Sequence, residues 1–321
     1  MKLGQSLYQM LWRARWLPLS ARKSIYKKLA DLDAAPDAPF VTDFFGLKYQ
    51  GNLNNSIEFS LYYFGAFEKP LLFFMRDCLQ ALTANTKDSG IDSVFCDIGA
   101  NIGQHSLFMS QFADHVLAFE PYGPVREKLQ FHIELNQIMN IAVHPVGLSQ
   151  QAETLPFFAP TGRNQGIGSF DAATISKGNK ETGHLQLVKG DDFLESQHLP
   201  PLTLVKIDVE GFEKNVLSGL RETLAKDRPV LVTEITYGNA LSFASLNELL
   251  SLLPPDYHLF AFNTRKADGS KARKRGARAK LSGEFELIDF RHWRETGQDD
   301  IVACPSEKLA LLPRKGLPAH H

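Results

Sequence analysis

The sequence has few cysteines and no long apolar run. Its three cysteines, Cys78, Cys96 and Cys304, are too few for a disulfide framework and lack metal-ligand spacing. A reducing, intracellular setting and a cytoplasmic location are therefore expected. No stretch approaches the roughly 20 apolar residues of a membrane span. Arg13 and Arg15 interrupt the N-terminus where a signal peptide needs an unbroken apolar run.

The sequence also has almost no net charge, -1 over 321 residues, but the charged residues are unevenly distributed along the chain. Residues 1–30 hold seven Lys or Arg and no acid, and residues 265–280 hold eight against one Asp, which leaves -15 for the remainder. The two basic segments are candidate contacts with an anionic surface, including a membrane face bound peripherally. Since 271–280 has no aromatic residue, we expect a mobile solvated loop and no base-specific binding of nucleic acid.

From residue 91 onward, apolar β-branched runs alternate with helical stretches. The runs are 93–98, 115–120, 141–148, 202–209, 230–235, 257–262 and 301–304. The first five lack polar alternation, so they predict buried parallel strands. Helical stretches at 125–137 and 212–224 complete a βαβ pattern, which indicates an α/β fold with a doubly wound sheet.

Residues 1–88 are expected to form an N-terminal extension on this core. It begins with a short amphipathic basic helix and a linker, followed by a hairpin at 40–51 and a helix at 68–82. The first helix either packs on the domain or anchors the protein at a membrane face.

The α/β domain is expected to span 89–312, followed by a tail at 313–321. It contains an insertion at 150–200 and the basic loop at 265–280. The polar stretch 161–169 in the insertion is interpreted as a lid or as a surface excursion.

The first strand leads directly into a glycine-rich turn. Its residues are Asp97, Gly99, Ala100, Asn101 and Gly103. Glycine lets a ligand approach the backbone, and the following helix start offers unpaired N–H groups. The next strand ends at Glu120, where an acid can accept both hydroxyls of a ribose. The pattern predicts a site for a nucleoside cofactor.

Two cofactor classes share this layout. A dinucleotide site needs Gly-x-Gly-x-x-Gly, but here the second and third glycine positions are Asn101 and Gln104. Asp97 lies where a pyrophosphate would bind, and a carboxylate repels phosphate but suits a cation. S-adenosylmethionine has a ribose, an ammonium and a sulfonium but no phosphate, so Asp97 and Glu120 favour it over NAD.

A second group of acids follows the fourth strand. Asp208 and Glu210 are candidate catalytic residues that position or deprotonate an acceptor hydroxyl, because acids crowded at a strand end are costly unless they bind cations or protons. Glu210 is equally interpreted as a helix cap, and Glu213 is expected on the solvent face of the next helix. Glu234 lies in an apolar run, so it is a third candidate catalytic residue, which lines the acceptor pocket or pairs with Lys206.

Two other chemistries receive less support. Asp208 and Glu210 offer two hard oxygen ligands, but no third ligand follows at a telling spacing, so no metal is predicted. His105 is a candidate base on residue type alone.

Together these motifs resemble the FkbM-type S-adenosylmethionine-dependent methyltransferases. The resemblance covers about 91–236 and rests on 97–103, Phe119-Glu120-Pro121, Asn136 and Lys206-Ile-Asp208-Val-Glu210-Gly211-Phe-Glu213. It implies a class I, Rossmann-like fold with seven strands, mostly parallel with the last antiparallel, and helices on both faces. It also places Pro121 and Gly147, with the turn, Glu120 and Asp208, in the cofactor site.

The resemblance implies O-methylation of a sugar, a glycan or a secondary metabolite. The identity of the acceptor does not carry over from the family. The alternatives are a methyltransferase directed at RNA or another polyanion, an NAD-dependent oxidoreductase, and a binding protein without catalysis.

Overall fold

The computed structural model describes residues 3–14, 16–84, 90–160, 168–266 and 270–316. The chain divides into two compact units, with the division between Phe67 and Glu68. The helix expected at 68–82 therefore belongs to the second unit. Among the described residues, no helix is both long and apolar enough to cross a membrane.

The first unit combines helices with a hairpin. Its elements are α1 (Leu3–Arg13), α2 (Leu19–Asp31), β1 (Pro39–Phe44), β2 (Leu47–Asn52) and α3 (Ser56–Phe64). Phe45 and Gly46 both have positive φ, which a tight two-residue hairpin turn requires. Trp12 packs on Tyr26 with 5.2 Å between ring centroids, so the N-terminal helix packs within this unit. Its role at a membrane stays a prediction.

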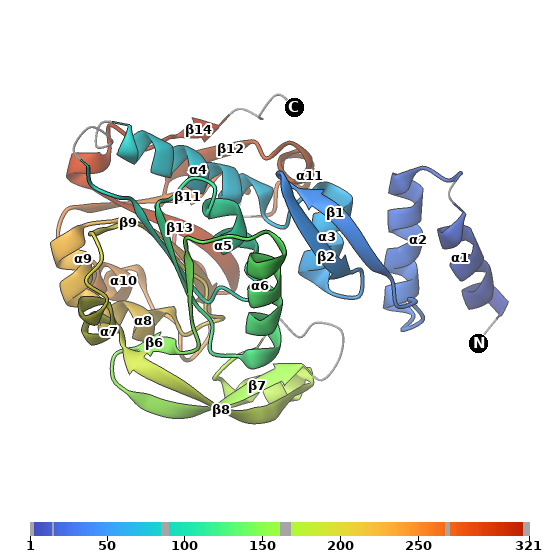
Figure 1. The fold of residues 1–321 in the computed structure, drawn as a ribbon, viewed down its shortest axis with the longest axis horizontal. Coiled ribbons are helices and arrows are strands. Elements are labelled where there is room, and N and C mark those ends of the chain that lie inside the picture. Colours follow the sequence, from blue (N-terminus) through green and yellow to red (C-terminus); the bar gives the residue numbers. More distant parts are fainter. Residues whose placement is uncertain (1–2, 15, 85–89, 161–167, 267–269, 317–321) are drawn as a thin grey trace. The chain divides into compact units, whose positions relative to one another are not determined.

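The second unit is built on a nine-stranded sheet (Figure 1). Its strands are β3 (Val94–Ile98), β4 (His115–Phe119), β5 (Ile141–His144), β9 (Leu202–Ile207), β10 (Val230–Tyr237), β11 (Tyr257–Phe262), β12 (Phe285–Asp289), β13 (Gly297–Pro305) and β14 (Lys315–Gly316). The order is β14-β12-β11-β13-β10-β9-β3-β4-β5.

The predicted α/β class is confirmed, but the predicted number of strands is wrong. From β5 to β10 the neighbouring strands are parallel, and β13 is antiparallel to both β10 and β11. The sheet has nine strands rather than seven because β12 and β14 extend it beyond β11. Part of the predicted tail thus forms the edge strand of the sheet.

The insertion forms a separate three-stranded sheet. It consists of β6 (Gly147–Ser149), β7 (Glu153–Pro160) and β8 (Asn179–Lys189). The run 141–148 was expected to be one strand, but it is divided between β5 in the large sheet and β6 in the small one. Of the candidate lid at 161–169, all but 168–169 lies outside the described residues. The Ser169 hydroxyl donates to the carbonyl of Glu210 at 3.3 Å.

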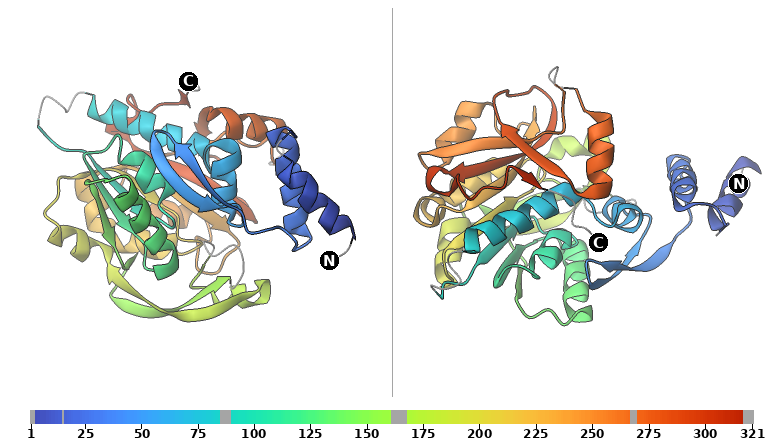
Figure 2. Two further views of the ribbon diagram at one scale, coloured as in Figure 1. Left: turned by 45° about the vertical axis from the view of Figure 1, so that its right-hand side comes forward. Right: turned by 90° about the horizontal axis from the view of Figure 1, so that it is seen from above.

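Helices cover both faces of the large sheet. They are α4 (Lys69–Thr83), α5 (Gln104–Met109), α6 (Gly123–Leu135), α7 (Gly190–Ser196), α8 (Glu213–Gly219), α9 (Arg221–Asp227), α10 (Leu246–Leu252) and α11 (Arg273–Ser282). Figures 1 and 2 show α4, in cyan, running along one face with α5 and α6, while α7 to α10 lie on the other. The predicted helix at 212–224 is two helices, α8 and α9.

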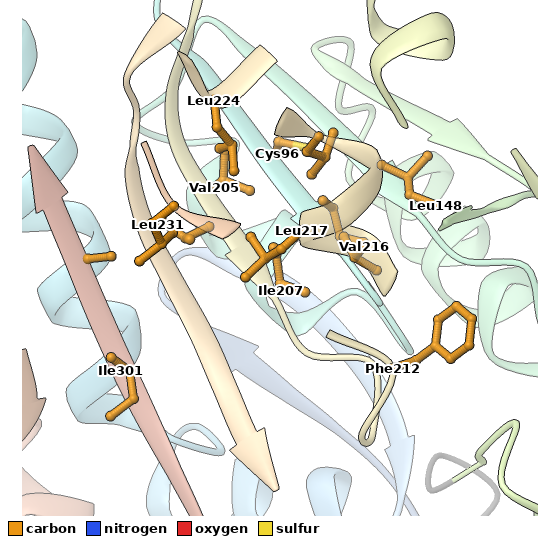
Figure 3. Close-up of a cluster of buried hydrophobic side chains, with 14 of the residues drawn as sticks. Cys96, Leu148, Val205, Ile207, Phe212, Val216, Leu217, Leu224, Leu231 and Ile301 are labelled. Carbon is orange, nitrogen blue, oxygen red and sulfur yellow. The ribbon is translucent and has the colours of Figure 1, made fainter. Parts of the chain in front are cut away.

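A buried apolar cluster joins α8 to the sheet (Figure 3). Val216 and Leu217 of α8 face Val205 and Ile207 of β9 in this cluster. Because side chains alternate along a strand, the residues between these apolar positions point to the opposite face. Asp97 lies between Cys96 and Ile98, and Lys206 lies between Val205 and Ile207, so both polar side chains meet on the α5 face.

The basic segment contains a helix where a solvated loop was expected. α11 begins at Arg273 and ends at Ser282, and its C-cap Gly283 has φ +79°. Its end is tied to α4 by the Lys69 ammonium, which donates to the carbonyl of Leu281 at 3.0 Å. Arg, Lys and Ala are good helix formers, so local propensity favours the helix despite its charge.

Candidate functional site

The glycine-rich turn is fixed by backbone contacts to the strands on either side of β3. The N–H groups of Gly99 and Ala100 both donate to the carbonyl of Phe119 at 3.0 Å, which ties the turn to β4. Gly99 has φ +84°, and a Cβ atom there would lie 1.9 Å from the backbone oxygen of Asp208. This close approach to the end of β9 admits only glycine.

Glu120 is held by the same turn. Its Oε2 accepts the N–H of Asn101 at 2.8 Å, and its Oε1 accepts the N–H of Tyr122 at 2.8 Å. Burial raises the pKa of Glu120 to about 7, against the lowering effect of these two backbone donors. A carboxylate has about four acceptor positions, so each oxygen keeps one for a further donor. Two free acceptor positions on one carboxylate match the paired hydroxyls of a ribose.

A buried lysine lies between two aspartates at the ends of β3 and β9. The fully buried Asp97 accepts a hydrogen bond from the Ser106 hydroxyl at 2.6 Å on Oδ2, while its Oδ1 lies 3.7 Å from the Lys206 ammonium. Lys206 Nζ donates to Asp208 Oδ2 at 3.1 Å. Burial alone would lower the pKa of Lys206, but the charges of Asp208 and Asp97 raise it overall.

Further acids gather beside this lysine at the carboxyl ends of β9 and β10. We call the following five the acidic cluster: Glu68, Asp208, Glu210, Glu234 and Asp300. Glu234 and Asp300 are direct partners in the β10–β13 register. The cluster includes all three predicted catalytic residues.

Burial and mutual repulsion hold protons on most of the acidic cluster. Burial first, and then the charge of Asp208, raises the pKa of Glu210 to about 8, of Asp300 to about 7 and of Glu234 to about 11. Burial and Asp300 also raise the pKa of Glu68 well above its ordinary value. At neutral pH, Glu234 is therefore a hydrogen-bond donor, and the Asp208 side chain lies 3.1 Å from Lys206 Nζ.

Glu213 does not lie on the solvent face, as the sequence had suggested. It is completely buried, and its Oε1 accepts the N–H groups of Gly211 at 2.9 Å and Val209 at 3.2 Å. This closes the turn after β9, in which Glu210 has φ +52°. Burial raises the pKa of Glu213 to about 7. Glu213 therefore supports the shape of the turn that carries Asp208 and Glu210.

The predicted cofactor residues divide into two groups. Those of the turn, with Glu120 and Asp208, lie together at the ends of β3, β4 and β9. Gly147 instead begins β6, where a Cβ atom would lie 2.4 Å from Leu187 Cδ2 and 3.5 Å from Pro121 Cγ. The carbonyl of Pro121 accepts from Arg126 at 2.7 Å. These contacts give Gly147 and Pro121 a packing role beside Glu120.

Three residues of the site were not predicted as site residues: Glu68, Lys206 and Asp300. Asp300, like Glu234, is an acid beside apolar strand residues, which could have marked it as a site residue. The strand was predicted at 301–304, however, which left Asp300 just outside it. Glu68 precedes a helix and belongs to no motif. The His105 ring lies 3.8 Å from Glu68 Oε2, and burial lowers its pKa well below the ordinary value, so it is neutral at physiological pH.

The residues fit a cationic nucleoside cofactor better than a metal ion. Glu120 offers two acceptor positions, and Asp97 Oδ1 is a buried oxygen with no hydrogen-bond donor among the described residues. Within the same part of the chain, no group of three or more His, Cys, Asp or Glu side chains is arranged to hold a metal ion.

Comparison with known proteins points to one enzyme family. Residues 97–262, just over half of the chain, match the family described as the methyltransferase FkbM domain. "Methyltransferase 1" of Beauveria bassiana is 28% identical over 197 residues, covering 53% of this chain and 79% of that protein. "Hexuronic acid methyltransferase AglP" of Haloferax volcanii is 31% identical over 142 residues, covering 44% of this chain and 55% of that protein.

A solved structure of methyltransferase FkbM from Methylobacillus flagellatus also aligns with this chain. The alignment has 16% identity and a TM-score of 0.39, and it covers 66% of this chain and 43% of that one. A superposition this loose carries no argument about the site. The chain spans about half the length of this protein and of the Haloferax relative.

Proposed function

The chain belongs to the FkbM methyltransferase family, and we propose that it transfers the methyl group of S-adenosylmethionine to a hydroxyl oxygen of a sugar or glycan. The family match confirms the resemblance found in the sequence and the enzyme class that it implies. The cofactor and the acceptor are the proposed part. The name of the Haloferax relative supports a sugar acceptor, and a secondary metabolite with a free hydroxyl is the broader alternative.

The cofactor assignment rests on Glu120. Its carboxylate is fixed by backbone donors at the end of β4, beside a turn that requires glycine at Gly99. S-adenosylmethionine supplies a methyl group on a positively charged sulfur, which an acceptor oxygen attacks by direct displacement. Asp97 and Asp208 favour a cation at this edge of the sheet.

The chain's own contribution to the chemistry is alignment and proton transfer. Asp208 follows β9, and it is the member of the acidic cluster whose backbone lies against the cofactor turn at Gly99, so its carboxylate is the proposed acceptor of the hydroxyl proton. Lys206 holds that carboxylate in position at 3.1 Å. Glu210 and Glu234 keep their protons at neutral pH, so they are proposed to donate hydrogen bonds to the acceptor rather than to act as bases.

Calorimetric titration of the full chain tests the cofactor, and turnover of methyl-labelled S-adenosylmethionine tests the acceptor. We expect binding of S-adenosylmethionine and S-adenosylhomocysteine, and label transfer to one class in a panel of glycans, lipids, peptides and metabolites. Binding of NADH instead would overturn the cofactor assignment. Transfer of label to RNA would overturn the acceptor class. Attachment of the two basic segments to an anionic surface stays a separate prediction.

A further inference from the structure

A hollow lies beside the acidic cluster at the same edge of the sheet. Its volume is about 380 Å³, and Phe262, Gln298 and Asp300 form part of its lining. Asp300 pairs with Glu234 of β10, and Ala261 pairs with Ile301, so Phe262 and Asp300 lie where β10 and β11 have their carboxyl ends. The hollow is within the size range of small-ligand sites, about 300–1,000 Å³. Because Asp300 belongs both to the lining and to the acidic cluster, the hollow adjoins the strand ends that carry the proposed reaction.

The acids on this wall are neutralised by the protein itself. Asp299 accepts from Arg265 Nε at 2.9 Å and lies 3.0 Å from Arg294 Nε, so two guanidinium groups share one carboxylate. Burial and the charge of Asp208 raise the pKa of Asp300 to about 7, which leaves it partly protonated at neutral pH. The acids therefore contribute little negative charge to the hollow.

Two cations in the lining have no ion-pair partner within the part of the chain that the structure describes. Lys271 and Arg273 line the hollow and are exposed. Neither side chain makes a hydrogen bond or an ion pair with another described residue, apart from a longer-range attraction of Lys271 to Asp299. Arg273 is the first residue of α11, which is anchored to α4, and Lys271 lies two residues before it, in a β-bridge with Arg265. The hollow thus combines a polar end at Asp300 and Gln298 with a cationic end.

We propose that this hollow binds an anionic group of the methyl acceptor, a carboxylate or a phosphate monoester, through Lys271 and Arg273. The inference rests on the proposed function, because it takes the acceptor to approach along this edge of the sheet. An ammonium and a guanidinium both form charge-assisted hydrogen bonds with oxyanions. The hydroxyls of the same acceptor face Gln298 and Asp300.

The test compares three sugars that differ in charge: D-glucuronate, D-glucose 6-phosphate and D-glucose. Their binding to the full chain is measured by ligand-observed NMR, with and without S-adenosylhomocysteine. We expect at least one anionic sugar to bind about tenfold more tightly than glucose, which corresponds to roughly 1.4 kcal/mol. Whichever anionic sugar binds more tightly distinguishes a carboxylate site from a phosphate site.

Matched variants locate the effect. The double variant Lys271→Gln/Arg273→Gln is expected to lose the preference for the anionic sugar. Lys274→Gln removes one charge from the same helix outside the hollow, so it is expected to keep the preference. All of the substituted residues are exposed, and glutamine preserves helix propensity, so the variants are expected to fold.

Equal binding of the three sugars to the parent protein would overturn the anion subsite. An equal loss in Lys274→Gln would also overturn it, because the effect would then reflect general surface charge. Calorimetry with S-adenosylmethionine on the same samples separates this outcome from failure of the proposed function. If the cofactor binds but no anion preference appears, only the subsite is wrong. If the anion preference appears without cofactor binding, the cofactor assignment is wrong.

Discussion

Buried acids at the carboxyl edge of the sheet are stabilised differently beside β3 and β4 than beside β9, β10 and β13. On the β3–β4 half, the protein supplies donors for its acids: Glu120 accepts two backbone N–H groups, and Asp97 accepts the Ser106 hydroxyl. On the β9–β10–β13 half, the acidic cluster has Lys206 and Gln298 as its main partners. In the second half, burial and the charge of Asp208 raise the pKa of Glu210, Glu234 and Asp300, so these acids keep protons instead of gaining donors.

Under the proposed function, the first half binds the cofactor through backbone geometry, which side-chain substitutions hardly change. The second half meets the acceptor through side chains from several segments, which can change independently. Substitutions in the first half should therefore affect cofactor binding, and substitutions in the second half should affect turnover or stability.

The largest effect is expected for Gly99→Ala. The added Cβ would lie 1.9 Å from the backbone oxygen of Asp208 at a φ of +84°, so the turn and the end of β9 cannot both keep their positions. We expect a stability loss of about 3 kcal/mol or more and a loss of cofactor binding of at least about 100-fold, because strain and displaced backbone add. Thermal unfolding and calorimetry measure both.

Gly123→Ala provides the matched control for this substitution. Its nearest neighbour would be a side-chain atom at 3.8 Å, so it should change stability by no more than about 0.5 kcal/mol. Similar behaviour of the two alanine variants would show that the turn at Gly99 is not the tight backbone contact described here.

The next effect is expected for Asp208→Asn, in the second half. Asparagine keeps the size of the side chain but cannot take a proton from the acceptor hydroxyl, so kcat should fall by roughly 100- to 1,000-fold. The Kd for S-adenosylmethionine should change far less. Glu222→Gln, on the exposed side of α9, should leave both values unchanged. A loss confined to Kd would reassign Asp208 from catalysis to cofactor binding.

A smaller effect, on the cofactor half, is expected for Glu120→Gln. Hydrogen bonds to a charged group contribute about 1.5–3 kcal/mol, so loss of the carboxylate should weaken S-adenosylmethionine binding roughly 10- to 100-fold. The exposed Glu127 lies on the next helix, and Glu127→Gln is the control. Equal affinity in the parent and in Glu120→Gln, measured by calorimetry, would remove the ribose assignment.

The same two halves explain what the sequence could predict. The turn 97–103 and Glu120 lie within 24 consecutive residues, and two parallel strands with a helix between them bring such residues together by a standard connection. The acidic cluster draws residues from 68, 208–210, 234 and 300, and Glu68 has no local signal at all. Long-range pairing, such as Glu234 with Asp300 across antiparallel strands, is not visible in local periodicity.

The fold shows the same limit. The parallel strands and the main helices were predicted, because buried apolar runs are a local signal. The extra strands β12 and β14 were not, since β14 has only two residues and depends on its pairing with β12. The helix α11 forms where the high charge of the segment predicts a solvated loop, because Arg, Lys and Ala all have high helix propensity.

The smallest effect is expected for Glu234→Gln, which probes the stored repulsion directly. The pKa of Glu234 is raised to about 11 by burial and by the charges of Asp208 and Asp300, against an ordinary value of 4.5. Its contribution to stability is therefore complete below pH 4.5 and is lost progressively as the pH rises toward 11, because only the unfolded chain releases the proton in that window. Glutamine never ionises, and its oxygen can still accept from Gln298 Nε2, which donates to Glu234 at 2.9 Å.

Glu234→Gln should therefore lie close to the parent in Tm at pH 5 and exceed it by a growing margin as the pH rises to 8, since each kcal/mol moves the Tm of a domain of 150–250 residues by roughly 2–4 °C. Glu210 and Asp300 titrate in both proteins, so the difference between the two melting curves reports Glu234 together with its interactions with them. Glu222→Gln again supplies the exposed control for the loss of one carboxyl group. If the Glu234→Gln difference is also constant with pH, the acidic cluster holds no stored repulsion at Glu234, and the contrast between the two halves of the edge fails at that residue.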